Sequence, residues 1–346
     1  MTITVYYATN RNETGTADAP DFGPNFHAHG PAYLRFGAAE VTPPPVPGGS
    51  YRVSRVMLAP EQIPGLNVAA TAAPVLGSRQ IFDTLRQKLK DNRADLLLLI
   101  HGYACDFHTA LERAAQVKAE YEQPSHPLEV AVFSWPADGS MVPLISYQRD
   151  RDDAKASGPA IARALLKVME YFRDLDRAAY CFQNLHLVAH SMGNYALRHT
   201  VQAVLGQHTA KVLPRLFKNI FLMAADEDND AFELDHKFAR LPELAEAVQV
   251  YYSATDGALT ISDVTKGNPD RLGSTGPRKL SDLPHKVTLI DCAAVDDTGL
   301  ADARHQYYRN RPEVVADVRQ ILAGTPADLI ANRDFVPAKS SFRIKA

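Results

Sequence analysis

From about residue 96 onward, short apolar runs alternate with longer segments whose apolar residues recur at helical spacing. Leu96 to Ile100 is an unbroken aliphatic run, which is typical of a parallel strand buried on both faces. Because strand and helix alternate, we expect a mostly parallel sheet with helices on both faces. The further strands predicted in this part of the chain are 128–133, 185–188, 219–223, 249–252 and 287–290. The predicted helices are 108–121, 159–172, 231–247 (interrupted by Pro242) and 313–322.

The first 77 residues follow a different pattern, in which short strand candidates alternate with loops rich in proline and glycine. The strand candidates are 3–7, 33–37 and 51–58. Ser78 is a candidate N-cap for a helix over 79–90. We therefore expect three parts: an irregular β-containing N-terminal extension over 1–77 packed on the core, an α/β core over 78–325, and a polar, weakly patterned tail over 326–346.

The segment Ala189-His190-Ser191-Met192-Gly193 joins a predicted strand to a predicted helix start. A serine on such a sharp turn exposes its hydroxyl above the sheet, and small residues on either side let strand and helix pass close together. The common form of this pattern begins with glycine, where this chain has Ala189. Taken alone, the segment also fits a serine N-cap with a small-residue contact. Ser191 is therefore a candidate nucleophile whose assignment depends on further groups.

Those further groups follow Ser191 at the ends of later strands, where sheets of this kind bind ligands. The chain order that such a turn requires is nucleophile, acid, base. Asp256 follows the second strand after Ser191 and is the candidate acid, with Asp226, one strand earlier, as the alternative. His305 follows the last predicted core strand and is the candidate base. His285 precedes that strand, and we expect it at the wrong edge of the sheet.

His101-Gly102-Tyr103 ends the first core strand and can aim a backbone N–H at the same edge. The N–H groups of Met192 and Tyr103 would then form an oxyanion hole, which stabilises the charge that develops during acyl transfer. The single tryptophan, Trp135, is a candidate wall of the site, and ordinary loop packing is an equal alternative. An apolar loop to about residue 153 and the segment 263–283 are candidate rims. The residues expected to line the pocket are His101, Gly102, Trp135, Tyr147 and His190.

Composition excludes several classes of function. The chain has 346 residues, a hydrophobic fraction of 46% and a formal net charge of -3, without a long basic run, so we expect no nucleic-acid partner. The charges of 149–153 cancel locally, which is typical of a solvated surface. The 3 widely spaced cysteines, and the lack of a leader or a membrane-length apolar run, favour a cytoplasmic protein with reduced thiols. No histidine pair has zinc-site spacing and the acidic stretch 226–230 lacks a calcium-loop pattern, so we expect neither metal nor cofactor.

The chain also resembles a bacterial branch of the α/β-hydrolase superfamily, long catalogued as a domain of unknown function. The resemblance implies an α/β-hydrolase fold and a triad of Ser191, an acid and His305. This branch usually has proline before Asp226, where this chain has Ala225. The matching pieces span nearly the whole chain: Tyr6-Tyr7-Ala8-Thr9-Asn10-Arg11, Ile100-His101-Gly102-Tyr103, Phe133-Ser134-Trp135-Pro136, Ala189-His190-Ser191-Met192-Gly193-Asn194, Ala224-Ala225-Asp226-Glu227-Asp228, Ser253-Ala254-Thr255-Asp256-Gly257-Ala258-Leu259 and His305-Gln306-Tyr307-Tyr308.

The sequence thus predicts a serine hydrolase, specifically a carboxylesterase that acts on a small or medium acyl ester through an acyl-enzyme intermediate. An acyltransferase or a lipase on the same triad is the alternative within enzymes. A binding module that keeps the fold without catalysis is the alternative outside them, because a fold alone does not prove chemistry. The sequence indicates neither the acyl and alcohol groups of the substrate nor the oligomeric state.

Overall fold

The computed structural model describes residues 2–46, 48–61, 76–139, 145–207, 213–259, 270–281, 283–295 and 304–346. The strands predicted from the sequence are confirmed, most of them with small shifts at their ends. The strands are β1 Ile3–Thr9, β2 Arg11–Glu13, β3 Phe22–Phe26, β4 Arg35–Thr42, β5 Arg52–Leu58, β6 Asp95–Ile100, β7 Leu128–Ser134, β8 Leu185–His190, β9 Phe217–Met223, β10 Ala245–Tyr252, β11 Val287–Asp291, β12 Arg333–Val336 and β13 Ser341–Ile344.

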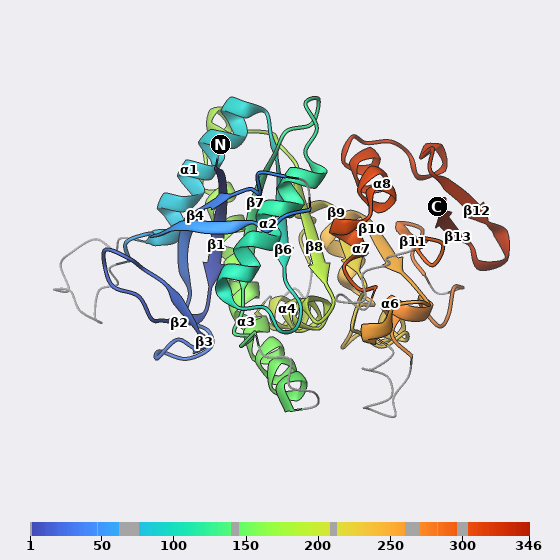
Figure 1. The fold of residues 1–346 in the computed structure, drawn as a ribbon, viewed down its shortest axis with the longest axis horizontal. Coiled ribbons are helices and arrows are strands. Elements are labelled where there is room, and N and C mark those ends of the chain that lie inside the picture. Colours follow the sequence, from blue (N-terminus) through green and yellow to red (C-terminus); the bar gives the residue numbers. More distant parts are fainter. Residues whose placement is uncertain are drawn as a thin grey trace.

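Within these described residues, one 11-stranded sheet has the order β12-β13-β11-β10-β9-β8-β6-β7-β1-β4-β5, and β2 and β3 form a small separate pair. All neighbouring strands from β13 to β1 run parallel, whereas β12, β4 and β5 pair antiparallel at the two edges. The expected mostly parallel sheet is therefore confirmed. Figure 1 shows the sheet extending from the N-terminal strands to the C-terminal pair.

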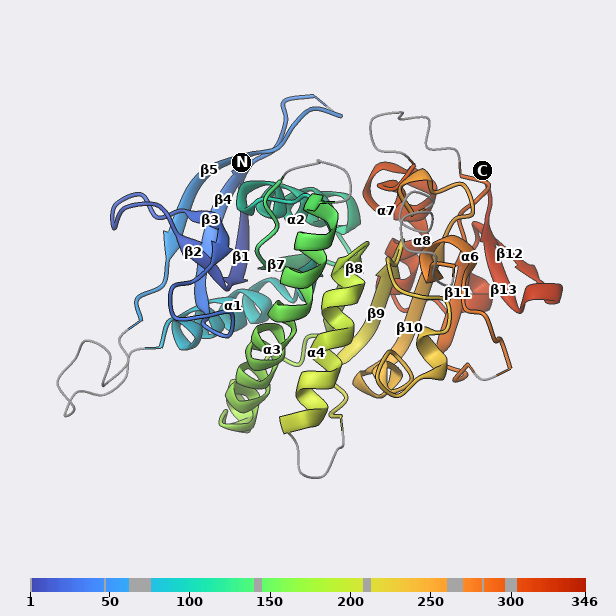
Figure 2. The same cartoon turned by 90° about the horizontal axis from the view of Figure 1, so that it is seen from below.

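Helices cover both faces of the sheet, as predicted. The helices are α1 Gly77–Asn92, α2 Phe107–Tyr121, α3 Ile145–Arg173, α4 Gly193–Gln207, α6 Leu272–Thr275, α7 Tyr307–Asn310 and α8 Pro312–Leu322. On one face α3 packs along α4, with α1 beside α3, and on the other face α2 packs with α7 and α8 (Figure 2). Asp106 caps α2 by accepting the backbone N–H of Thr109 at 2.7 Å. Ser78 is not an N-cap, since α1 begins at Gly77 and Leu76 occupies the cap position.

Two helix predictions are wrong in ways that have a physical reason. The predicted helix over 231–247 is replaced by short 3₁₀ turns at Ala231–Glu233 and Leu241–Leu244, and β10 begins at Ala245. Pro242 disfavours a continuous helix there, and the first residues of β10 pair instead with β9. Helix α3 begins at Ile145 and not at 159, because Pro159 is accommodated inside the helix. Residues 145–153, predicted to be a loop, are therefore helical.

The sheet runs through all three predicted parts of the chain. Strands β1, β4 and β5 from the N-terminal extension form one edge region, and β12 and β13 from the weakly patterned tail form the other. The tail is anchored by a buried ion pair, in which Arg333 Nη2 of β12 donates to Asp317 Oδ1 of α8 at 2.7 Å. The two residues of this ion pair are 16 positions apart in the sequence. Such a contact leaves no periodic pattern of apolar residues by which the tail strands could be predicted.

Candidate active site

The strand order reverses beside β6, and this reversal creates the position for a site. Strand β7 follows β6 in the chain and lies on one side of it, while β8 lies on the other side. In open α/β sheets, ligands bind at the carboxyl ends of the strands that flank such a switch. Gly102 follows β6 and Ser191 follows β8 at this place. A Cβ added to Gly102 would lie 2.8 Å from Ser191 Cβ and 3.3 Å from its Oγ, so the turn after β6 lies directly against the serine.

Ser191 is held in a strained turn between β8 and α4. Its φ of 55° lies in the left-handed region that non-glycine residues seldom adopt. The turn is over-determined by backbone hydrogen bonds: Ser191 N–H donates to Met223 O at 3.0 Å, and Asp226 N–H donates to Ser191 O at 3.2 Å. A Cβ on Gly193 would lie 2.4 Å from Ile100 O, so only glycine permits this close passage of helix and strand. The geometry is that of a nucleophile elbow.

Asp256 and His305, far apart in the sequence, are brought together by the ends of β10 and β11. His305 Nδ1 donates to Asp256 Oδ2 at 2.7 Å. The other carboxylate oxygen accepts the backbone N–H groups of Ala258 at 3.1 Å and Leu259 at 3.2 Å. Because Nδ1 carries the proton, Nε2 of His305 is left with the lone pair that a general base needs. Both residues are largely buried, since 1% of Asp256 and 8% of His305 is exposed to solvent.

His190 links this pair to the serine. It precedes Ser191 in the chain, and its Nε2 donates to the backbone oxygen of His305 at 3.1 Å. Its ring lies 4.7 Å from the His305 ring and stacks on Tyr308 at 4.4 Å. Burial, together with nearby positive charge, holds the pKa of His190 well below its usual value, so the ring is neutral. His190 was expected in the pocket, but only 2% of it is exposed, and it lies beneath the backbone of His305.

Asp226, the alternative acid, has different partners. Tyr147 donates its hydroxyl to Asp226 Oδ2 at 2.5 Å, and Arg271 Nε lies 3.4 Å from Oδ1. Asp226 touches the elbow through its backbone, since its N–H donates to Ser191 O. The geometry therefore favours Asp256 over Asp226 as the partner of His305. His285, the other histidine considered, is exposed and precedes β11.

His101 and Trp135 were expected to line the pocket, but they form a buried layer behind the turn at Gly102. Their ring centroids lie 4.8 Å apart with an interplanar angle of 12°. Only 1% of His101 and 0% of Trp135 is exposed to solvent. Trp135 donates its backbone N–H to His101 Nε2 at 3.2 Å and its indole N–H to His101 O at 2.9 Å. Burial keeps the pKa of His101 well below its usual value, and its Nδ1–H donates to Gly102 O at 2.9 Å. The alternative of ordinary packing therefore describes Trp135 better than that of a pocket wall.

The turn after β6 presents the candidate oxyanion donors. Among the hydrogen bonds of the described residues, the backbone N–H groups of Tyr103 and Met192 have no acceptor. The Tyr103 ring lies 5.7 Å from that of Tyr147, and both side chains are partly exposed. Tyr147, a residue expected in the pocket, is therefore partly exposed beside the ring of Tyr103. The expected rim residues 140–144 and 263–269 lie outside the described residues.

Two buried charged residues that the sequence analysis did not assign hold the loop after Tyr103. Ala104 has a φ of 49°, and its N–H donates to Asp150 Oδ2 of α3 at 3.0 Å. Arg11 donates from Nη2 to Cys105 O at 2.7 Å and from Nη1 to Ala137 O at 2.9 Å. Both Arg11 and Asp150 are 0% exposed, and burial raises the pKa of Asp150 to about 6.

The solvated surface predicted for 149–153 is therefore wrong at Asp150. A signal was present in the sequence, because Asp150 is in helical register with the buried residues Ala154, Ser157 and Ile161 of α3. Arg11 ends the first of the pieces that carry the family resemblance, although no role follows from that alone.

Over the described part of the chain, no group of three or more His, Cys, Asp or Glu side chains is arranged to hold a metal ion. All three cysteines are buried and free of disulfides. Of the helices described, none has both the length and the apolar character needed to cross a membrane.

The sheet and the strained serine turn together define an α/β hydrolase. The chain belongs to the family described as alpha/beta hydrolase of unknown function (DUF900), whose model matches residues 79–330. The match begins in α1 and ends after α8, so β1 to β5 and the β12–β13 pair lie outside it. No protein with curated annotation is similar enough to the chain to count as a relative. The predicted superfamily and fold class are confirmed, and hydrolase activity is indicated without a reaction class or substrate.

Proposed function

We propose that the protein is a serine hydrolase, specifically a carboxylesterase for small or medium acyl esters. The observation that carries the proposal is the 2.7 Å hydrogen bond between His305 and Asp256, at the same edge of the sheet as the strained turn of Ser191. Nucleophile, acid and base also follow one another along the chain in the order that this fold uses.

In this mechanism Ser191 Oγ attacks the ester carbonyl while its proton passes to His305 Nε2. Asp256 holds the imidazole in the required tautomer and stabilises its positive charge once Nε2 is protonated. The tetrahedral intermediate collapses, and the proton on Nε2 passes to the leaving alcohol. Water then repeats the cycle on the acyl-enzyme and releases the carboxylic acid.

The backbone N–H groups of Met192 and Tyr103 are the proposed donors to the oxyanion. Their lack of acceptors among the described residues supports this role, because it leaves both donors available to a ligand. A single donor of this kind contributes about 2.7–4 kcal/mol to transition-state stabilisation. We propose an ester and not an amide because an alcohol leaves more readily than an amine.

Labelling with a fluorophosphonate probe tests the proposal directly. Wild type and Ser54→Ala, an exposed serine in β5, should be labelled, and Ser191→Ala should not. A chain-length series of nitrophenyl esters should then be hydrolysed by wild type and not by Ser191→Ala. Added alcohols that raise product formation would indicate acyl transfer, and activation by lipid vesicles would indicate a lipase. Folded wild type that resists the probe would leave the non-catalytic binding module as the better explanation.

A further inference from the structure

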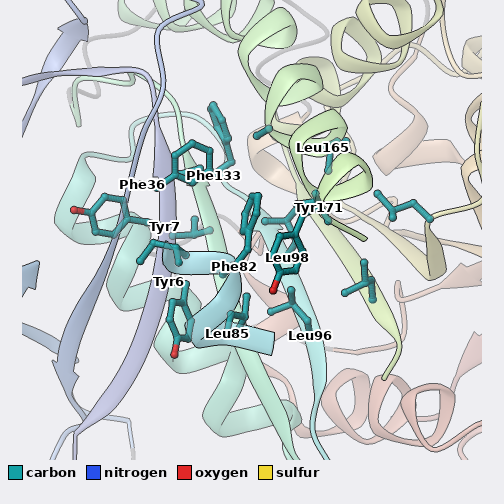
Figure 3. A pocket seen from close by; sticks show the side chains of 18 of the residues that line it. Tyr6, Tyr7, Phe36, Phe82, Leu85, Leu96, Leu98, Phe133, Leu165 and Tyr171 are labelled. Carbon is teal, nitrogen blue, oxygen red and sulfur yellow. The ribbon is translucent and has the colours of Figure 1, made fainter. Parts of the chain in front are cut away.

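An apolar cavity lies between the sheet and helices α1 and α3. Its volume is about 110 Å³. Figure 3 shows side chains from the sheet and from both helices around this space, among them Phe82 and Leu85 of α1, Leu98 of β6 and Tyr171 of α3. Protein interiors are close-packed, so a void of this size is uncommon. For comparison, an apolar cavity of about 150 Å³ binds benzene or xenon in another protein.

The cavity is separate from the candidate active site. It is lined by Leu185 and His186 at the start of β8, whereas Ser191 follows the end of that strand. Six residues of extended chain span roughly 20 Å. None of Ser191, Asp256 and His305 lines the cavity.

The polar groups around the cavity are not equally satisfied. His186 is fully buried, and its ring nitrogens lie 3.3 Å from Asp95 Oδ2 and 3.2 Å from Asn219 Nδ2. Arg86 of α1, which is partly exposed, donates from Nε to the Tyr171 hydroxyl at 2.9 Å and from Nη1 to Ala179 O at 2.9 Å. Both acceptors are neutral, and within the described ranges no carboxylate forms an ion pair with Arg86.

Arg79 provides the contrast on the same face of α1. Its guanidinium lies 4.9 Å from the centre of the Tyr171 ring and pairs with Asp83 at 3.4 Å. The Tyr171 hydroxyl that Arg86 contacts itself donates to Asp83 Oδ1 at 2.7 Å, so Arg79 and Arg86 share one nearby carboxylate. Two guanidiniums that share one carboxylate leave an excess of positive charge beside the apolar space, which is complementary to a molecule with an alkyl tail and an acidic head.

We propose that this cavity binds a medium-chain aliphatic carboxylate, with the terminal carbons of the alkyl tail in the cavity and the carboxylate on Arg86. Transfer of the tail out of water is the main driving force. A guanidinium binds a carboxylate with charge-assisted hydrogen bonds, which selects the acid over the corresponding alcohol. The proposal does not depend on the proposed esterase activity, because it concerns binding at a different place.

The experiment is a titration of the full-length protein with decanoate and with decanol, followed by calorimetry and by the methyl NMR signals of leucine, isoleucine, valine and methionine. Decanoate should shift the methyl signals of Leu85, Leu98 and Leu165, all of which line the cavity. Shifts centred on Met192 and Leu259 would place decanoate at the Ser191 site and would overturn the proposal. The absence of any methyl shift at the highest soluble concentration of decanoate would also overturn the proposal. This readout needs no variant.

Two matched pairs of variants sharpen the result. Ala164→Leu, which fills the cavity from α3, should weaken both ligands at least tenfold, whereas Ala119→Leu, on an exposed position of α2, should weaken neither. Arg86→Gln should weaken decanoate several-fold and leave decanol unchanged, and Arg79→Gln should change neither. An equal loss of affinity for decanoate and decanol in Arg86→Gln would contradict the assignment. So would undiminished binding of both ligands in folded Ala164→Leu.

Discussion

The ends of β9 and β10 each carry a buried aspartate, and the two aspartates are held in different ways. Asp256 receives two backbone N–H groups on one oxygen and the imidazole of His305 on the other. Asp226 receives the Tyr147 hydroxyl and faces Arg271. The same residue type at adjacent strand ends is therefore suited to different tasks, because its partners differ. A carboxylate that orients a histidine affects turnover, whereas a carboxylate that neutralises a buried arginine affects folding.

The largest expected effect comes from Asp256→Asn. Loss of the carboxylate removes the preference for the Nδ1–H tautomer of His305, and in a serine protease the equivalent change costs about 10⁴-fold in kcat. We expect a loss of that order with nitrophenyl esters as substrates, and a loss below tenfold for Asp226→Asn. If kcat fell further in Asp226→Asn than in Asp256→Asn, the roles of the two residues would have to be exchanged.

A second change acts on the nucleophile side. Gly102→Ala places a Cβ 2.8 Å from Ser191 Cβ, so the turn after β6 must move and carry the N–H of Tyr103 with it. We expect kcat to fall about 10²- to 10³-fold, as for loss of one oxyanion donor. Labelling rates with the fluorophosphonate should fall in parallel. Unchanged kcat in a folded Gly102→Ala protein would remove Tyr103 from the oxyanion hole.

Asp226→Asn should show its main effect on stability. The substitution leaves the fully buried guanidinium of Arg271 with one fewer negative neighbour, although Asp228 Oδ1 remains 2.5 Å from Arg271 Nη1. Removing one partner of a buried ion pair typically costs about 3 kcal/mol. Urea unfolding should show this loss for Asp226→Asn and a smaller one for Asp256→Asn. The reverse order would mean that the two carboxylates do not divide activity and stability in this way.

Asp150 extends the comparison to a carboxylate that accepts the backbone N–H groups of Ala104 and Asp138, and the expected effect is the smallest. Burial raises its pKa to about 6 from the ordinary value of 3.8, so the folded state prefers the protonated form. Because the folded pKa is the higher one, the contribution of Asp150 to stability falls as pH rises between about 4 and about 6.

The matched variant is Asp150→Asn, whose amide oxygen can still accept the N–H of Ala104. Its free energy of unfolding should exceed that of wild type by a margin that grows from pH 4 to pH 7, with kcat within about threefold. Asp150→Ala removes the acceptor and should lower kcat further. A constant stability difference across this pH range would contradict the raised pKa.

The sequence predicted the parallel strands because Leu96 to Ile100 and its counterparts are apolar throughout, a pattern that burial on both faces imposes. It also placed Ser191, Asp256 and His305 at strand ends in the correct order, and the structure brings Asp256 and His305 into contact. The catalytic roles of these residues remain predictions.

What the sequence did not predict depends on tertiary contacts. The tail forms β12 and β13 because Arg333 finds Asp317 and because β11 offers an edge, neither of which is a local property. Residues 245–247 extend β10 because β9 lies alongside them, although they were expected to end a helix. Asp150 was placed on the surface because charged residues usually are, whereas in the fold it satisfies the N–H of Ala104.

Arg11 ties the beginning of the chain to the loop on which the proposed chemistry depends. Its guanidinium spans from the carbonyl of Cys105 to that of Ala137, across the ends of β6 and β7, and β1 itself is hydrogen-bonded to β7. An expression fragment trimmed to residues 79–330, the span that the family shares, would lack this brace and the strands at both edges of the sheet. Anyone who assays the isolated family region should therefore expect an inactive or unstable product, even though every residue of the proposed triad is retained.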